Sequence, residues 1–196
     1  RADRITSAGT LTYTVDANGN LAARGTDTFT CDQADRLKTT SVAGTASSYA
    51  YDGDGKRASK TVGGATTSYL HDVNASLPVL LDDGARKYIW GLGLGYAVDS
   101  SAVPIVYHAD GCGSVRALTD SSGSIVQNYQ YDEYGVVLSS QGAITQPFGY
   151  TGEVSDAETK LLSLRARMYD PGMGRFMTRD SVFGLKMNPA SVNRYS

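Results

Sequence analysis

Few side chains in this sequence are spaced for chemistry. The run 52–56, Asp-Gly-Asp-Gly-Lys, opens like a calcium-binding loop, but its sixth position is Arg57 and its twelfth is Gly63, where such a loop needs Gly and Glu. His71 and His108 are the only two histidines, which is too few for a zinc site of their own. The sequence therefore predicts no metal and no cofactor, and it predicts that 52–56 is a hairpin turn.

The composition narrows the class of protein. The 196 residues include 22 Gly and 13 Tyr, and Asp far outnumbers Glu, which argues against helical bundles. With 41% apolar residues the chain can bury a core, yet no apolar run approaches the roughly 20 residues of a membrane span. A net charge of −2 gives no electrostatic footprint for nucleic acid. Cys31 and Cys112 could form one disulfide or remain two thiols, and because the sequence begins with Arg1 we expect a piece of a longer protein.

A repeat of about twenty residues runs along the chain. Its mark is an aromatic residue three positions before an aspartate, and the steps between successive aspartates are 16, 20, 20, 38, 22 and 38 residues. Each long step equals two units of 19, so we expect degenerate units near positions 91 and 151. The units are Tyr13 with Asp16, Phe29 with Asp32, Tyr49 with Asp52, Tyr69 with Asp72, Tyr107 with Asp110, Tyr129 with Asp132 and, without the upstream aromatic, Tyr169 with Asp170.

Each unit predicts a strand, a turn and a second strand. Side chains two apart share one face of a strand, so Tyr49 and Tyr51, like Tyr129 and Tyr131, are expected on the same face. The aspartate ends the strand because its carboxylate accepts hydrogen bonds from the next backbone amides. Residues 155–168 have helical propensity, but the period favours a hairpin turning near 157–160. We predict an all-β protein of antiparallel hairpins in one long curled sheet, a shell or strip with few or no helices.

The residues also resemble a known family. Tyr-x-Tyr-Asp units are similar to the tyrosine-aspartate (YD) repeats of bacterial RHS proteins, and the segments 108–120, 148–153 and 164–180 resemble the RHS repeat-associated core. This resemblance divides the chain into YD repeats (1–105), core (106–184) and a C-terminal extension (185–196). The motif residues that carry it are Gly113, Ser114, Arg116, Arg165, Arg167, Pro171, Gly174, Arg175 and Phe176.

The resemblance implies a secreted or cell-surface shell that encloses a C-terminal toxin, with the core closing one end. In many members an aspartate frees the toxin by self-cleavage, a role that maps to Arg179 and Asp180, with Asp170 as a further acid. The usual proline after the aspartate is Ser181 here. An arginine beside an aspartate stabilises the ionised carboxylate, so we favour a structural ion pair of Arg179 with Asp180 over catalysis.

Three hypotheses follow, and the first is favoured. The chain is a structural wall that encloses or presents a cargo polypeptide, or packs against further YD repeats of its own protein, and it is not an enzyme beyond a single self-cleavage. In the second, it is an autoproteolytic aspartic-protease module. In the third, it is a surface or filament protein that self-associates through its sheet edges, with carbohydrate as a ligand of the tyrosine face. No nucleic acid and no membrane span are expected in any of them.

Overall fold

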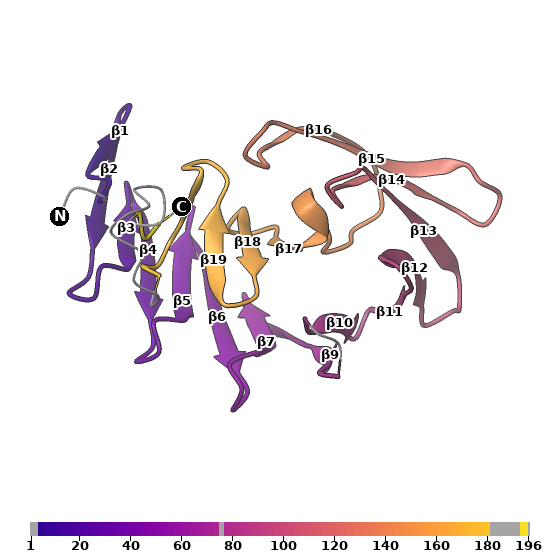
Figure 1. Cartoon of the computed structure of the whole chain (residues 1–196), viewed down its shortest axis with the longest axis horizontal. Coiled ribbons are helices and arrows are strands. Elements are labelled where there is room, and N and C mark those ends of the chain that lie inside the picture. The colour runs from indigo at the N-terminus through magenta and orange to yellow at the C-terminus, as the bar shows by residue number, and fades with distance from the viewer. Residues whose placement is uncertain (1–3, 75–76, 181–192, 196) are drawn as a thin grey trace, which may run out of the picture.

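The computed structural model describes residues 4–74, 77–180 and 193–195, and these form three antiparallel sheets (Figure 1). The first sheet contains β1 (Ser7–Ala8), β2 (Leu11–Val15), β3 (Leu21–Arg24), β4 (Asp27–Cys31), β5 (Leu37–Val42), β6 (Thr45–Tyr51), β7 (Arg57–Val62) and β8 (Ala65–Ser68). The second contains β9 (Leu70–Asp72), β10 (Val79–Asp82), β11 (Arg86–Trp90), β12 (Leu94–Asp99), β13 (Pro104–Ala109), β14 (Val115–Thr119), β15 (Ile125–Tyr131) and β16 (Val137–Gly142). The third contains β17 (Val154–Asp156), β18 (Leu161–Leu164), β19 (Arg167–Asp170) and β20 (Arg175–Phe176), and the described residues otherwise hold only the 3-10 turn η1 (Tyr150–Gly152).

The first two sheets form one bent strip. Residues 65–72 behave as a single strand with a corner at Tyr69, because β8 pairs with β7 and β9 pairs with β10. The Tyr69 amide still donates to the carbonyl of Ala58, 2.9 Å away, so the ladder runs into the corner without a break. Strand order follows chain order on both sides, and neither sheet closes on itself. The predicted long curled antiparallel sheet is confirmed, and we call β1–β16 the wall.

Aspartate turns join many of the strands. At Asp52 the amide donates to the carbonyl of Lys56 (2.9 Å), and the Asp52 carboxylate accepts the amides of Asp54 (3.0 Å) and Lys56 (2.8 Å). A bulge precedes the turn, and Gly55 has a φ of 85°, which favours glycine. The segment 52–56 is therefore a hairpin turn, as predicted. The same three bonds recur at Asp32, Asp99, Asp110, Asp120 and Asp132.

The first turn of the repeat, at Asp16, is closed differently from the others. The Asp16 amide donates to the carbonyl of Asn20 (2.8 Å), and the Asp16 carboxylate accepts the Asn20 amide (2.8 Å). Its second oxygen accepts the Asn20 side-chain amide at 3.1 Å, and that side chain also reaches Asp35 of the next turn at 2.7 Å. The predicted bond from the Asp16 carboxylate to a following backbone amide is therefore present, and the buried Asn20 side chain adds a second bond to the same carboxylate. Asp72 keeps the bond to the amide of Asn74 (2.9 Å), and its turn then runs into residues outside the described ones.

The repeat was correct in length, and one of the two degenerate units that it predicts lies in the wall. Between Asp72 and Asp110 the chain adds the four strands β10–β13, and the turn near position 91 is closed by glycines without an aspartate, with the Gly91 amide donating to the Gly93 carbonyl (2.9 Å). Aspartates close the turns on both sides of it, at Asp83 and at Asp99. The expected unit near 151 is not a hairpin of the wall, because η1 carries the chain away from the second sheet. The turn expected near 157–160 is confirmed by the pairing of β17 with β18.

The aromatic residues of the repeat form the core. Three positions before their aspartates, Tyr13, Phe29, Tyr49 and Tyr107 are all less than a tenth exposed. They point to the face of the wall that the third sheet covers, which we call the inner face. The predicted boundary between YD repeats and core, at 105/106, falls within β13, so the structure shows no break there and the division stays a prediction from the sequence. Most of the predicted C-terminal extension, 185–196, lies outside the described residues.

Candidate functional site

The third sheet lies on the inner face of the wall. Figure 1 shows β17–β19 between the first sheet and the curled second sheet. Leu161, Met168 and Met177 come from this part of the chain, and they are buried in one cluster with Tyr13 and Tyr49 of the wall. We call β17–β20 the inner sheet. Its apolar side chains cover the aromatic row of the first sheet and remove both from water.

A buried cluster of charges also joins the inner sheet to the wall. Asp156, at the end of β17, lies 2.7 Å from the Arg57 guanidinium and 2.9 Å from Lys60 Nζ, and Lys60 is 3.1 Å from Glu158. The Asp156 side chain is fully buried and that of Arg57 is 8% exposed. Burial lowers the pKa of Arg57, but the charge of Asp156 outweighs it and the pKa is raised. The cluster is therefore an ionic clamp between β7 and the inner sheet.

The Arg57 position breaks the pattern of the repeat. Five residues after the aspartate, other units place Leu21, Leu37 or Val115 in the core. Arg57 takes that position after Asp52, and its guanidinium lies over the ring of Tyr69, 4.9 Å from the centroid. A charge thus replaces an aliphatic side chain at the point where the inner sheet docks.

Asp170 makes a second clamp at the other end of the inner sheet. Its carboxylate pairs with Arg24 of β3, which also bonds Asp27 at 3.0 Å. The same carboxylate accepts the Gly172 amide at 2.8 Å, as in the turns of the wall. Asp170 is 2% exposed, so this predicted site residue is held between β19 and β3.

The other two predicted catalytic residues lie apart from that clamp. Arg179 is exposed, and within the described residues it forms no ion pair. Asp180 lies 3.1 Å from Arg167, and its amide donates to the carbonyl of Arg194 (2.8 Å). The expected ion pair of Arg179 with Asp180 was therefore wrong, since Arg167 of β19 takes that place. A self-cleavage role for these residues stays a prediction.

The Gly113–Ser114 motif anchors the segment that leads from the wall to the inner sheet. The Ser114 hydroxyl, 1% exposed, accepts the Thr151 amide at 2.9 Å, and the Val115 amide donates to the Gly149 carbonyl at 3.0 Å. Gly113 has a φ of 86°, and a Cβ there would lie 3.4 Å from the Thr151 carbonyl oxygen. The motif holds η1 against β14.

The remaining motif residues serve the inner sheet and its neighbours. Arg116 pairs with Asp110 at 2.8 Å, and Arg165 with Glu153 at 2.8 Å. Arg167 lies over the Phe176 ring, 3.6 Å from its centroid. Pro171 is buried, Gly174 approaches the ring of Tyr134, and Arg175 pairs in the ladder with Asp170.

Phe148 fills the inner face of the second sheet. Its ring meets Tyr88, Trp90 and Tyr107 edge-on, at centroid distances of 4.9, 5.6 and 6.0 Å. Such edge-to-face contacts stabilise an aromatic cluster beyond the area that it buries. Phe148 thus fills the core against β9–β16, as Leu161 and Met168 fill the core against β2–β7.

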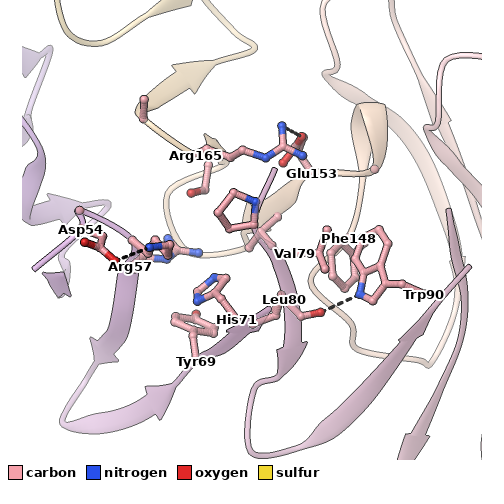
Figure 2. Close-up of a pocket in the computed structure, with 17 residues that line it drawn as sticks. Asp54, Arg57, Tyr69, His71, Val79, Leu80, Trp90, Phe148, Glu153 and Arg165 are labelled. Carbon is pink, nitrogen blue, oxygen red and sulfur yellow. Dashed lines mark hydrogen bonds and ion pairs between the residues drawn. The ribbon is translucent and has the colours of Figure 1, made fainter. Parts of the chain in front are cut away.

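A cavity of about 280 Å³ remains at the corner of the strip (Figure 2). Figure 2 shows Arg165 and Glu153 on one side of it, Tyr69 and His71 on another, and Phe148 with Trp90 beyond. Burial and the charge of Arg57 lower the pKa of His71, so its imidazole is held neutral. Burial raises the pKa of Glu153, although Arg165 opposes this. The cavity is an aromatic pocket with a polar rim whose acids and bases are mostly paired.

A larger cavity of about 660 Å³ lies on the opposite side of the inner sheet. The wall contributes β15 and β16, with Tyr129 and Tyr131, and the inner sheet contributes Leu162 and the Asp170 turn. The two cavities leave the interior only partly filled by the inner sheet. Across residues 4–74, 77–180 and 193–195 no three potential metal ligands lie together, and no described helix is long and apolar enough to cross a bilayer. Both cysteines are free thiols.

Comparison with known proteins identifies the class. The family described as Teneurin YD-shell matches residues 1–196, and the chain belongs to this family. It is 31% identical over 206 residues to the tRNA3(Ser)-specific nuclease WapA of Bacillus spizizenii, and 30% identical over 208 residues to Teneurin-1 of Gallus gallus. Each alignment covers 99% of this chain, but only 9% of WapA and 8% of the teneurin.

Solved structures share the fold. The chain superposes on a component of the TcdB2–TccC3–Cdc42 crystal structure with a TM-score of 0.71, and on the Photorhabdus luminescens Tc holotoxin pore with 0.73. Identity is 18% in both, and each match covers 92% of this chain and 10% of the other. The resemblance to YD-repeat proteins is confirmed, and the chain is a structural β-shell segment about a tenth as long as these relatives.

Proposed function

We propose that this chain is the part of a YD shell that encloses or presents a polypeptide cargo, with the inner sheet closing the space behind it. The observation that carries the proposal is the inner sheet itself, a polypeptide seated on the aromatic inner face by apolar contacts and two ionic clamps. A face that binds one extended polypeptide so closely is suited to hold another. The relatives named as a nuclease and as a holotoxin pore support a toxin as cargo, carried outside the producing cell.

Protease protection tests this function. In the natural polypeptide that carries this chain, a segment outside residues 1–196 should resist proteinase K under native conditions. Arg57→Leu breaks the clamp at Asp156 and should make that segment digestible, because the inner sheet loosens. Lys56→Leu, which removes a surface pair with Asp54, is the matched control and should keep protection. Equal digestion of the segment in the wild-type protein and in both variants would reject enclosure.

Self-cleavage is a second proposal, for Asp180 with Arg179 and Asp170. Both aspartates belong to the part of the chain that turns back onto the wall, where a cut would separate wall from downstream chain. The intact mass of a longer natural polypeptide decides it. Asp180→Asn should leave one uncut species where the wild-type protein gives two fragments, and identical processing in both would dismiss the idea.

Self-association through the sheet edges is a third proposal. β1 and β16 each pair with one neighbour among the described strands, which leaves an edge that a second copy could use. Sedimentation velocity over a range of concentrations tests it. A species that stays monomeric throughout would count against assembly.

A further inference from the structure

The last strand of the wall carries an open edge beside the larger cavity. Within the described part of the chain, β16 pairs only with β15, so one row of its backbone amides and carbonyls faces no strand. Two apolar side chains at its start, Val137 and Leu138, are 51% and 65% exposed. An exposed apolar edge is a template for pairing with another extended chain.

The cavity beneath β16 provides pockets for the side chains of such a chain. Tyr129 and Tyr131 stack with their centroids 6.1 Å apart, and Tyr150 meets Tyr131 at 5.8 Å. Ser140 pairs across the ladder with Tyr129, and it lines the cavity together with Val137, so β16 contributes only these two smaller side chains to the inner side. The space of about 660 Å³ lies within the range that buries a ligand of several side chains.

The opposite boundary of this cavity is polypeptide. Lys160 and Leu162, from the turn and strand of the inner sheet, face the same space. The cavity therefore continues the interface between the inner sheet and the wall, where extended chain already packs on the aromatic face. This continuity favours another polypeptide over a sugar, which would use the rings but not the free edge.

One cation of the cavity is left for the bound chain to pair with. Of the two cations that line the cavity, Arg24 is paired with Asp170, whereas Lys160 makes no ion pair with any described residue. An acidic side chain on the occupant would meet that lysine. The chemistry of the site thus specifies an extended, mostly apolar segment with an Asp or Glu at one end.

We infer that β16 and the cavity beneath it are the docking site for an extended, apolar, acid-bearing segment of the cargo polypeptide. The segment pairs with the free edge of β16 as an added strand and places alternate side chains among Tyr129, Tyr131 and Leu162. The inference rests on the proposed enclosure of a cargo and states where that cargo touches the wall.

Photo-cross-linking from two adjacent positions tests the site. In the natural polypeptide that carries this chain, p-benzoylphenylalanine replaces Ser140, on the inner side of β16, or Ser139, which pairs with Gln130 of the other face. After irradiation, mass spectrometry identifies what each position has captured. We expect Ser140 to yield several-fold more adduct than Ser139, with peptides from outside residues 1–196 that contain Asp or Glu.

Two substitutions sharpen the test. Lys160→Glu reverses the only unmatched cation among the described cavity residues and should lower the Ser140 adduct several-fold, whereas Lys160→Arg should leave it near the wild-type yield. Equal adducts at both positions, adducts only within residues 1–196, or a carbohydrate adduct at Ser140 would each overturn the inference. Protease protection is measured on the same samples: a protected segment without a Ser140 adduct rejects this docking site alone, whereas loss of protection rejects enclosure itself.

Discussion

Arg57→Leu should destabilise the chain, although leucine is the residue that other units of the repeat have at this position. Leucine suits the position, since Leu21 and Leu37 occupy it in other units. The loss arises at Asp156, whose side chain is fully buried and would keep only Lys60 as a cationic partner at 2.9 Å. Removing one member of a buried ion pair typically costs about 3–5 kcal/mol, and the remaining Lys60 places the expected cost at the lower end.

The size of this loss can be measured by thermal and urea denaturation. For a chain of 150–250 residues each kcal/mol lowers Tm by about 2–4 °C, so a loss near 3 kcal/mol should lower the Tm of the variant by roughly 6–12 °C. Native-state hydrogen exchange should show the loss first in β17 and β18, because β17 ends at Asp156 and pairs with β18. Lys56→Leu, at an exposed pair, is the control and should leave Tm unchanged.

A double variant distinguishes a clamp from a packing defect. In Arg57→Leu with Asp156→Leu no uncompensated carboxylate remains, and an apolar pair of similar volume is often neutral or stabilising in such a site. The double variant should therefore be more stable than Arg57→Leu alone. Melting of Arg57→Leu within a degree or two of the wild-type protein would contradict the clamp, and so would simple addition of the losses of the single variants Arg57→Leu and Asp156→Leu.

Three further outcomes follow from single groups. Burial and the charge of Arg57 hold the pKa of His71 below 6.5, so the contribution of the neutral imidazole to stability is present above pH 6.5 and is lost as the pH falls below it. His71→Gln should flatten that part of a plot of Tm against pH, and an unchanged slope would contradict the assignment. Burial and nearby aspartates raise the pKa of Cys31 to about 12, whereas Cys112 is exposed, so iodoacetamide at pH 8 should label Cys112 long before Cys31 when followed by intact mass. Asp132→Ala removes two bonds from its carboxylate to turn amides at 2.9 and 2.8 Å and should cost about 1–2 kcal/mol in urea denaturation, which Asp132→Asn should partly restore.

The fold could be predicted because its determinants are local. An aspartate that bonds the amides two and four residues ahead closes a turn within five residues, whatever lies elsewhere in the chain. The side-chain period of two then fixes which residues share a face, and Tyr49 is buried for that reason. Neither statement needs a contact between distant segments, so both could be made from the sequence.

Two turns with the full set of aspartate bonds were missed for an equally local reason. Asp120 is preceded by Ala117, not by an aromatic residue, so the search pattern excluded it, although its turn bonds match those of the other units. Asp99 does follow Tyr96, but it lies off the 19-residue spacing, and Ala102 stands at a φ of 58° where most of the other turns have glycine. A search for the turn itself, without the upstream ring, would have found Asp120.

The docking of the inner sheet could not be predicted, because its contacts join residues that no period relates. Arg57 and Asp156 are 99 positions apart, and Arg24 and Asp170 are 146 apart. The resemblance to the RHS core implied that this segment closes one end of a shell, which stays a prediction. It did not indicate which charges hold it, and it placed emphasis on Arg179, which is exposed.

The exceptions to the repeat nevertheless mark where the contact forms. Asp156 ends β17 as other aspartates end their strands, yet the amides of Thr159 and Lys160 bond its main-chain carbonyl, at 3.2 and 2.8 Å. Its carboxylate is thereby free of the turn and available to Arg57, which itself occupies an aliphatic position. In a chain built from one local rule, an aspartate released from its turn and a cation inside the core each carry an unmet charge. Because burying either alone is costly, the two exceptions stabilise one another, and the inner sheet docks where they meet.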